Sequence, residues 1–67
     1  MAHGIVVAFD EQKGYGTVRD EDGVEYFFHC TQIADGSRSI AAGAGVSFQV
    51  VAGRLGRWEA AELTPET

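Results

Sequence analysis

The stretch KGYGTVRDEDGVEYFFHC, residues 13–30, decides the fold, because it predicts two strands joined by a tight hairpin. EDG at residues 21–23 suits a three-residue loop with Gly23 in the left-handed conformation. Such a loop fixes which residues lie opposite each other: Arg19 and Glu25, Val18 and Tyr26, Thr17 and Phe27, Gly16 and Phe28, Tyr15 and His29. The opposite charges of Arg19 and Glu25 support this register, since a slip of one residue would separate them.

The two faces of this hairpin carry different side chains. Val18, Tyr26 and Phe28 share one face, and the glycine there permits close packing, so we expect this face to form the core. The other face then holds Tyr15, Phe27 and His29 in water. Exposed aromatic rings take up unpaired bases by stacking, at about 1–3 kcal/mol per base. The hairpin therefore predicts a flat surface for a planar ligand.

Three further segments read as strands, because they are rich in β-branched and aromatic residues. They are residues 3–10, 46–51 and 57–63. In the second of them, Val46, Phe48 and Val50 are expected to point inward. TPET, residues 64–67, is expected to fray. With the hairpin, these strands predict an all-β fold, a small five-stranded antiparallel barrel, since closure removes exposed sheet edges.

A longer connection, residues 31–45, joins the third expected strand to the fourth and contains three glycines and two serines. We expect a short helical turn at residues 31–33, with Ile33 and Ile40 as apolar anchors.

The length of 67 residues favours a single domain, 1–67, because there is room for one core only. Nearly every apolar side chain is needed for that core, so we expect function on a face, and an enzyme is disfavoured. Cys30 is the only cysteine, which excludes an intrachain disulfide and favours a reducing, cytoplasmic location. No apolar run predicts a membrane span, and residues 1–10 lack the features of a signal peptide.

The net charge of −5, from ten acidic and five basic residues, argues against a nucleic-acid partner, because that affinity comes largely from neutralised phosphates. The placement of the charges reduces this objection. Asp20, Glu21 and Asp22 lie at the hairpin tip, whereas Lys13 lies at the opposite end beside Tyr15. Strands of about six residues span roughly 20 Å, about twice the Debye length at 0.1 M salt, so the tip is largely screened from that end.

GIVVAFDEQKGYGTV (residues 4–18), followed by YFFHCTQI (residues 26–33), resembles the bacterial cold-shock domain. The similarity covers nearly the whole chain, including GAGVSFQV (residues 43–50) and EAAEL (residues 59–63). The resemblance implies an OB-type barrel that binds single-stranded RNA or DNA through aromatic motifs on its second and third strands. It also implies that four residues stack on bases or contact phosphates: Lys13, Tyr15, Phe27 and His29.

The chain departs from the family pattern at several binding positions. The family usually has lysine and tryptophan directly before Phe9, where this chain has valine and alanine, and phenylalanine is common at the positions of Thr17 and Cys30. The long connection also lacks an aromatic residue that the family has there, and Arg38 is near that position in the sequence. Phe9, Thr17 and Arg38 are therefore candidate members of a reduced binding surface. If each lost ring removed about 1 kcal/mol, binding would weaken by about two orders of magnitude or more.

The turn before the last expected strand carries residues that compensate in this prediction for the missing aromatic rings. GRLGRWEAA, residues 53–61, carries Arg54, Arg57 and Trp58 where the family usually has glycine and proline. In cold-shock domains this turn borders the binding face. We hypothesise that Trp58 is a relocated stacking residue and that the two arginines contact phosphates. The alternative is that Trp58 belongs to the core.

Other functions have less support. His29 is next to Cys30, but neighbouring strand residues point to opposite faces and His3 is the only other histidine, so no metal site or catalytic triad is predicted. The expected function is weak binding of single-stranded RNA or DNA by a monomer, with little sequence preference, no cofactor and a role as an RNA chaperone or in gene expression. The alternative is a diverged barrel that contacts a protein.

Overall fold

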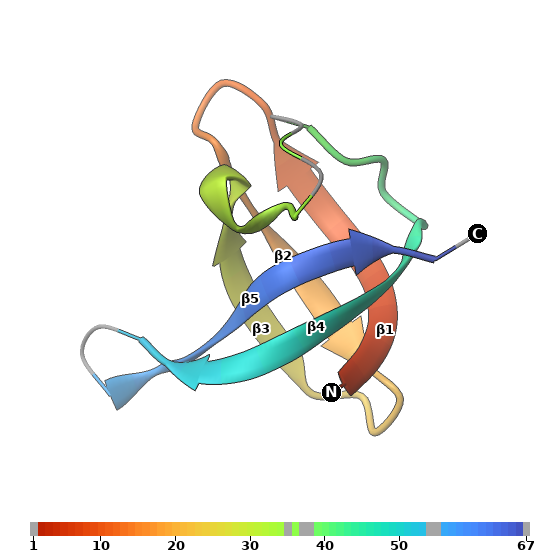
Figure 1. Ribbon diagram of the computed structural model, residues 1–67, viewed down its shortest axis with the longest axis vertical. Helices are drawn as coiled ribbons and strands as arrows, with labels where there is room; N and C mark the ends of the chain where they lie inside the picture. Colours follow the sequence, from red (N-terminus) through yellow and green to blue (C-terminus); the bar gives the residue numbers. More distant parts are fainter. Residues whose placement is uncertain (1, 35, 37–38, 54–55, 67) are drawn as a thin grey trace.

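The computed structural model describes residues 2–34, 36, 39–53 and 56–66. In chain order its elements are β1 (Ala2–Asp10), β2 (Tyr15–Asp20), β3 (Glu25–His29), the 3₁₀ helix η1 (Cys30–Gln32), β4 (Gly45–Ala52) and β5 (Trp58–Pro65). The strands close into a barrel in the order β1-β2-β3-β5-β4 (Figure 1), which confirms the predicted small five-stranded barrel. The pairings are antiparallel except that of β3 with β5, which is parallel at Phe27 and Glu59.

The hairpin of β2 and β3 has the predicted register, with Tyr15 opposite His29 and Arg19 opposite Glu25. Gly23 has a φ of +86°, which is the left-handed conformation that the loop requires. The Asp20 carboxylate fastens the loop, because its Oδ1 accepts hydrogen bonds from the backbone N–H groups of Asp22 and Val24, both at 2.9 Å. The turn chemistry thus sets which side chains share a face.

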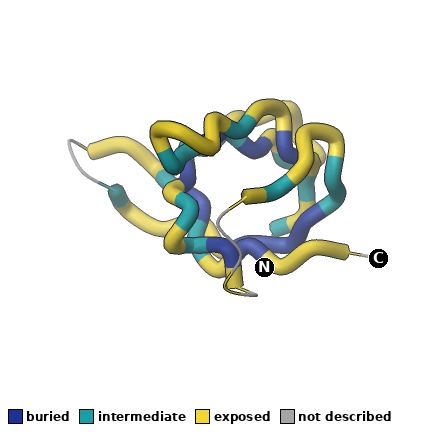
Figure 2. Tube along the Cα trace, turned by 90° about the horizontal axis from the view of Figure 1, so that it is seen from above, coloured by how far each residue is buried: buried dark blue, intermediate teal, exposed yellow. Residues whose placement is uncertain are grey.

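The core fills the barrel, and buried positions are spread around its whole circumference (Figure 2). The buried hydrophobic residues are Val6, Val18, Phe28, Ile33, Val46, Phe48, Ala60 and Leu63. Gly16 is needed beside Phe28, because an added Cβ would collide with the Ala8 carbonyl oxygen and press on the Phe28 ring. Ile33 is buried and Ile40 packs against the core, so both predicted anchors of the long connection are confirmed.

The prediction that Val50 points inward is wrong, because its side chain is 39% exposed. The pairing of β4 with β5 shifts register between Ser47 and Gln49, and three consecutive residues, 46–48, are buried there. Such an irregularity interrupts the alternation of side chains along a strand. Beyond it, β4 and β5 continue as a hairpin that projects from the barrel (Figure 1).

The expected fraying of residues 64–67 is contradicted at Thr64 and Pro65, which continue β5 and pair with β4. Glu66 donates its backbone N–H to the carbonyl oxygen of Gly45 at 2.8 Å. Its carboxylate lies 2.6 Å from Nδ1 of His3 on β1. The local sequence of residues 64–67 does not reveal that β4 and β1 supply their bonding partners, so it predicted a frayed tail.

In the part of the chain that the structure describes, no helix is both long and apolar enough to cross a membrane.

Candidate nucleic-acid interface

Tyr15, Phe27 and His29 form one group of rings on the outer side of β2 and β3, and we call these residues the aromatic cluster. The ring centroids of Tyr15 and Phe27 are 5.1 Å apart with an interplanar angle of 43°. The Phe27 and His29 rings meet edge to face, with centroids 4.9 Å apart. Tyr15 and Phe27 are half-buried and His29 is exposed. The rings therefore lie together outside the core, as predicted, but the first two are partly covered.

Lys13 lies in the turn between β1 and β2, next to the aromatic cluster. Its Nζ is 5.9 Å from the centroid of the Tyr15 ring, within the range of a cation–π contact. Oδ1 of Asp10 accepts hydrogen bonds from the backbone N–H groups of Gln12, at 3.0 Å, and Lys13, at 3.1 Å, and so shapes this turn. The structure thus places the Lys13 ammonium group beside the Tyr15 ring of the aromatic cluster.

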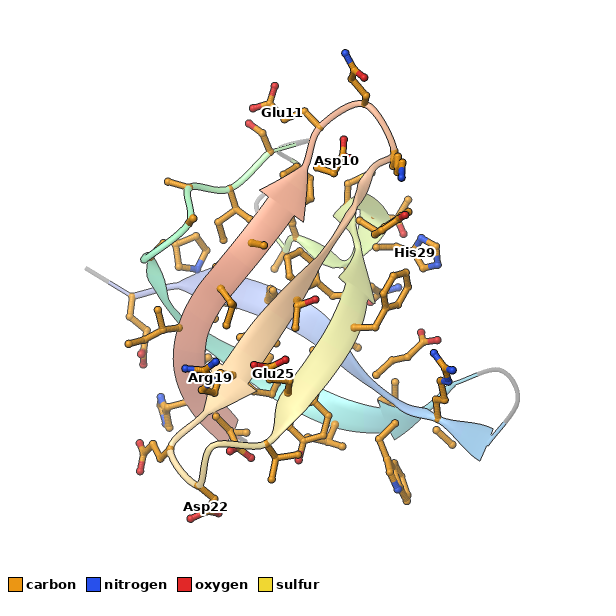
Figure 3. The ribbon with its side chains drawn as sticks, turned by 180° about the vertical axis from the view of Figure 1, so that it is seen from behind. Asp10, Glu11, Arg19, Asp22, Glu25 and His29 are labelled. Carbon is orange, nitrogen blue, oxygen red and sulfur yellow. The ribbon has the colours of Figure 1, made fainter. Side chains whose placement is uncertain are left out.

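The acidic residues are less segregated than the sequence interpretation assumed. Figure 3 shows Asp22 at the β2–β3 tip, far from His29, as expected. The same view shows Asp10, at the end of β1, and Glu11, in the turn that holds Lys13, at the other end of the strands. Two carboxylates near Lys13 would lower the contribution expected from a contact between Lys13 and a phosphate.

Arg19 and Glu25 extend the outer face from the aromatic cluster toward the hairpin tip (Figure 3). Nη2 of Arg19 lies 2.7 Å from Oε2 of Glu25, and both side chains are about half exposed. The sequence interpretation used this pair only to fix the register. The sequence nevertheless indicated that Arg19 lies on the outer face, because residues 15, 17 and 19 share one side of a strand. Glu25 partly neutralises the charge of Arg19, which makes Arg19 less available to a second anion.

Phe9 does not join the aromatic cluster. It lies opposite Gly16 on β2 and stacks on Phe28, with ring centroids 5.8 Å apart and an interplanar angle of 12°. A register shift between Val6 and Ala8 places Ala8, not Val7, opposite Thr17 and so brings Phe9 opposite Gly16. Phe9 is therefore half-buried against the core, and its contribution is to support the ring of Phe28.

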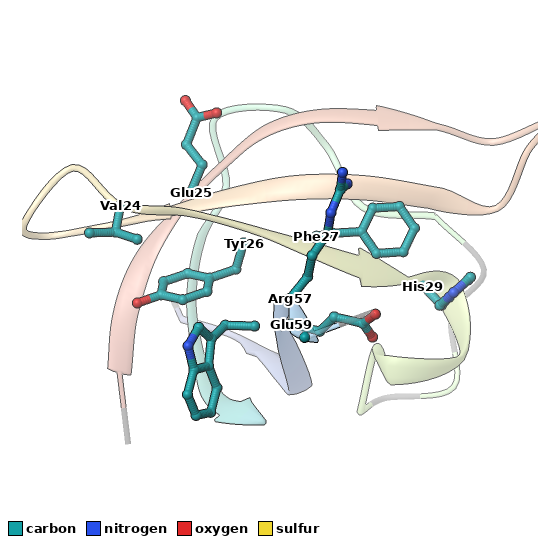
Figure 4. Close-up of a pocket in the computed structure, with 9 residues that line it drawn as sticks. Val24, Glu25, Tyr26, Phe27, His29, Arg57 and Glu59 are labelled. Carbon is teal, nitrogen blue, oxygen red and sulfur yellow. The ribbon is translucent and has the colours of Figure 1, made fainter. Parts of the chain in front are cut away.

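A groove of about 660 Å³ lies between β3 and the start of β5, and we call it the β3–β5 groove (Figure 4). Its lining includes Tyr26, Phe27, His29, Arg57, Trp58 and Glu59. Phe27 and His29 also belong to the aromatic cluster, so the two surfaces are continuous. Trp58 is 62% exposed, which excludes a core position and leaves its ring accessible in the groove.

Arg57 and Glu59 project into the β3–β5 groove from neighbouring positions of the chain. In Figure 4, the Arg57 side chain rises toward Phe27 and the Glu59 carboxylate extends toward His29. The carboxylate lies against Gly53, where an added Cβ would overlap it. The sequence interpretation named Arg57 but missed Glu59, although the spacing of two residues along a strand predicts a shared side. Arg38 and Arg54, the other two predicted basic residues, lie outside the described residues.

Tyr26 connects the β3–β5 groove to the core. Its ring packs on buried Phe48, with centroids 5.8 Å apart, and its hydroxyl donates to Oδ2 of Asp20 at 3.3 Å. Burial of the phenol raises the pKa of Tyr26 above its ordinary value of 10.0, and the negative charge and hydrogen bond of Asp20 raise it further. Tyr26 is therefore a neutral wall of the groove at physiological pH.

Cys30 is half-buried and packs against the core, as expected for a small apolar residue. Among residues 2–34, 36, 39–53 and 56–66, no group of three or more His, Cys, Asp or Glu side chains is arranged to hold a metal ion.

The comparisons with known proteins agree with the class that this barrel and its outer aromatic rings define. Residues 2–66 match the family described as "'Cold-shock' DNA-binding domain". The chain therefore belongs to the cold-shock domain family.

Individual relatives support this assignment. The chain is 40% identical over 57 residues both to cold shock protein CspB of Geobacillus stearothermophilus and to cold shock protein CspD of Bacillus subtilis (strain 168). Each match covers 84% of this chain and 86% of the relative. Glycine-rich protein 2 of Nicotiana sylvestris is 42% identical over 65 residues, which are 94% of this chain but only 30% of that protein.

A solved structure shows the same fold. The chain superposes on the structure described as drosophila Unr CSD456 with a TM-score of 0.80 and 27% sequence identity. The match covers 98% of this chain and 26% of the larger one.

Proposed function

We propose that this cold-shock domain binds single-stranded RNA or DNA by stacking unpaired bases on the aromatic cluster. The observation that carries the proposal is the position of Phe27, whose ring centroid lies 5.1 Å from that of Tyr15 and 4.9 Å from that of His29. A continuous aromatic surface outside the core accepts bases at about 1–3 kcal/mol each, whatever their sequence, because every base has a π face. The family description and the cold-shock relatives support the same function.

The strand would follow a path from Lys13 across the aromatic cluster into the β3–β5 groove. Lys13 stands beside Tyr15, and Arg57 stands beside Phe27 in the groove, so a cation flanks the cluster on each side. Trp58 adds a stacking surface at the far end. Arg54 remains a predicted phosphate contact, and Arg38 remains a predicted member of the binding surface. Thr17 is an outer-face neighbour of Phe27.

Binding should be weak and should depend little on salt. Thr17 and Ala8 present no ring on the outer face, so fewer bases stack than on a full set of aromatics. Few cations are available, and log K falls with log salt in proportion to the phosphates neutralised, so the slope should be shallow. The domain would act in the cytoplasm as a monomer that holds strands unpaired, as an RNA chaperone or in gene expression, without a chemical reaction.

A fluorescence titration tests this function. Trp58 is the only tryptophan and lines the β3–β5 groove, so its emission reports on a base that stacks there. We expect saturable quenching by an unstructured single-stranded oligonucleotide and much less by a duplex of the same length. Unchanged emission at high oligonucleotide concentration, with no binding by a second method, would reject the proposal.

Binding of a protein is the second candidate, and exposed apolar residues of β1 favour it. Ile5 is 55% exposed and Val7 is 40% exposed. They line a shallow depression together with Arg19, Asp20 and Glu21 of the hairpin end. A protein that fits this depression would carry both apolar and basic side chains. If protein binding is the function, added oligonucleotide should leave the Trp58 emission unchanged.

A further inference from the structure

Arg57 and Glu59 place a cation and a carboxylate on the same side of the β3–β5 groove, next to the ring of Phe27. We propose that this part of the groove selects guanine, with Glu59 as the specificity-determining residue. The inference rests on the proposed binding of single-stranded nucleic acid and goes beyond it, because stacking alone does not distinguish bases.

The position of Glu59 is fixed by the sheet. Its backbone pairs with Phe27 of β3 on one side and with Val51 of β4 on the other. In a parallel pair, the side chains of opposed residues project from the same side of the sheet. A base that stacks flat on Phe27 therefore presents an edge toward the Glu59 side chain. Glu59 is half-buried, so a hydrogen bond to its carboxylate is stronger than it would be in open water.

The chemistry of the carboxylate distinguishes the bases. An ionised carboxylate only accepts hydrogen bonds, and its two oxygens receive two parallel donors best. Guanine alone among the common bases has two adjacent donors on its Watson–Crick edge, N1–H and N2–H. Adenine and cytosine offer one amino group beside an acceptor nitrogen, and uracil and thymine offer one N–H between two carbonyl oxygens. Glu59 therefore favours guanine and repels the acceptors of the other bases.

Arg57 complements this choice at the neighbouring edge of the base. O6 and N7 of guanine are both acceptors, and arginine commonly donates to this pair of atoms. With Arg57 toward Phe27 and Glu59 toward His29, the groove offers donors and acceptors to two neighbouring edges of one stacked base (Figure 4). Tyr15 does not line this groove, so a base that stacks on Tyr15 would be accepted whatever its identity.

Fluorescence anisotropy with labelled oligouridine hexamers that contain one central variable base tests the proposal. We expect the hexamer with guanine to bind the natural chain about tenfold more tightly than the hexamer with inosine, which lacks only the N2 amino group. Glu59→Gln should remove most of that difference, because an amide oxygen is a weaker acceptor and the adjacent NH₂ is a donor. Glu21→Gln at the hairpin tip makes the same change of net charge at a residue that does not line the groove, and it should keep the difference.

The inosine comparison does not depend on whether a variant folds, and circular dichroism of Glu59→Gln checks its fold. Equal affinities of the natural chain for guanine and inosine hexamers would overturn the guanine site and leave the proposed function standing. An undiminished preference in folded Glu59→Gln would overturn the role of Glu59. Absence of binding to every hexamer would overturn the proposed function and this inference with it.

Discussion

The rings of Phe27 and Tyr15 touch diagonally across two strands, with centroids 5.1 Å apart. Neither residue lies directly opposite the other, because Phe27 pairs with Thr17 and Tyr15 pairs with His29. Diagonal neighbours on one face of an antiparallel pair lie within reach of aromatic side chains, and the small side chain of Thr17 leaves space for the Phe27 ring. The contact gives the chain a stacking surface that exists before any ligand arrives.

Phe27→Leu tests the stacking role of this ring while it keeps an apolar side chain. We expect the affinity for an unstructured oligonucleotide to fall about tenfold, because loss of one base–aromatic stack costs about 1–3 kcal/mol. Anisotropy of a labelled oligonucleotide measures the change. Ile5→Ala is the control, since Ile5 is 55% exposed on β1, does not line the β3–β5 groove, and its loss should change affinity little. Equal affinities of Phe27→Leu and the natural chain would exclude stacking on Phe27.

Trp58→Ala tests the groove. Trp58 is 62% exposed, so we expect the free energy of unfolding to change by less than about 1 kcal/mol and the affinity to fall several-fold. Urea unfolding followed by circular dichroism measures the first quantity, and anisotropy measures the second. Val50→Ala, an exposed apolar residue of the same hairpin, should leave affinity unchanged. Unfolding of Trp58→Ala would show that Trp58 supports the barrel instead.

Phe28→Ala tests the assignment of the core face. Phe28 is fully buried and stacked on Phe9, so we expect a loss of about 3–5 kcal/mol in the free energy of unfolding. A domain of this size has a stability of only about 5 kcal/mol, so the variant should keep about 2 kcal/mol or less and be measurably unfolded at room temperature. The near-ultraviolet circular dichroism spectrum reports this directly. A cooperative transition of natural stability in Phe28→Ala would mean that the two faces of the hairpin are reversed.

Titration to alkaline pH tests the environment of Tyr26. The folded state raises the pKa of Tyr26 above 10.0, through burial first and then Asp20, so folding favours the protonated phenol. The resulting stability is fully present below about pH 10 and is lost as the pH rises through the raised pKa. Phenolate absorbance of Tyr15→Phe follows Tyr26 alone.

Asp20→Asn keeps an acceptor for the loop amides but removes the charge, and it should lower the pKa of Tyr26. If the pKa of Tyr26 stays the same in this variant, the contact of its hydroxyl with Asp20 does not exist in solution.

The sequence predicted the hairpin and the aromatic cluster well because both depend on local rules. A three-residue loop closed by Gly23 allows one register, and that register alone determines that Tyr15, Phe27 and His29 share a face. The opposite charges of Arg19 and Glu25 gave an independent check on the same offset. Residues far apart in the chain were not needed for any of these inferences.

The errors arose where distant segments meet or a strand is irregular. Val50 turned outward because the register of β4 shifts between Ser47 and Gln49, which local alternation does not reveal. Glu59 was missed because its place beside Phe27 depends on the closure of the barrel between β3 and β5. The expected separation of charges failed for a simpler reason, since Asp10 and Glu11 precede Lys13 by three and two residues and lie at the same end of the strands.

Chemical-shift mapping tests the central claim most directly. Two-dimensional ¹H–¹⁵N NMR spectra of the labelled chain, recorded as an unstructured single-stranded oligonucleotide is added, report which amides sense the ligand. We predict that the largest shifts occur at Tyr15, Thr17, Phe27 and His29, with smaller ones along β5 near Trp58. Shifts concentrated at Ile5 and Val7, or no shifts at saturating oligonucleotide, would contradict the account.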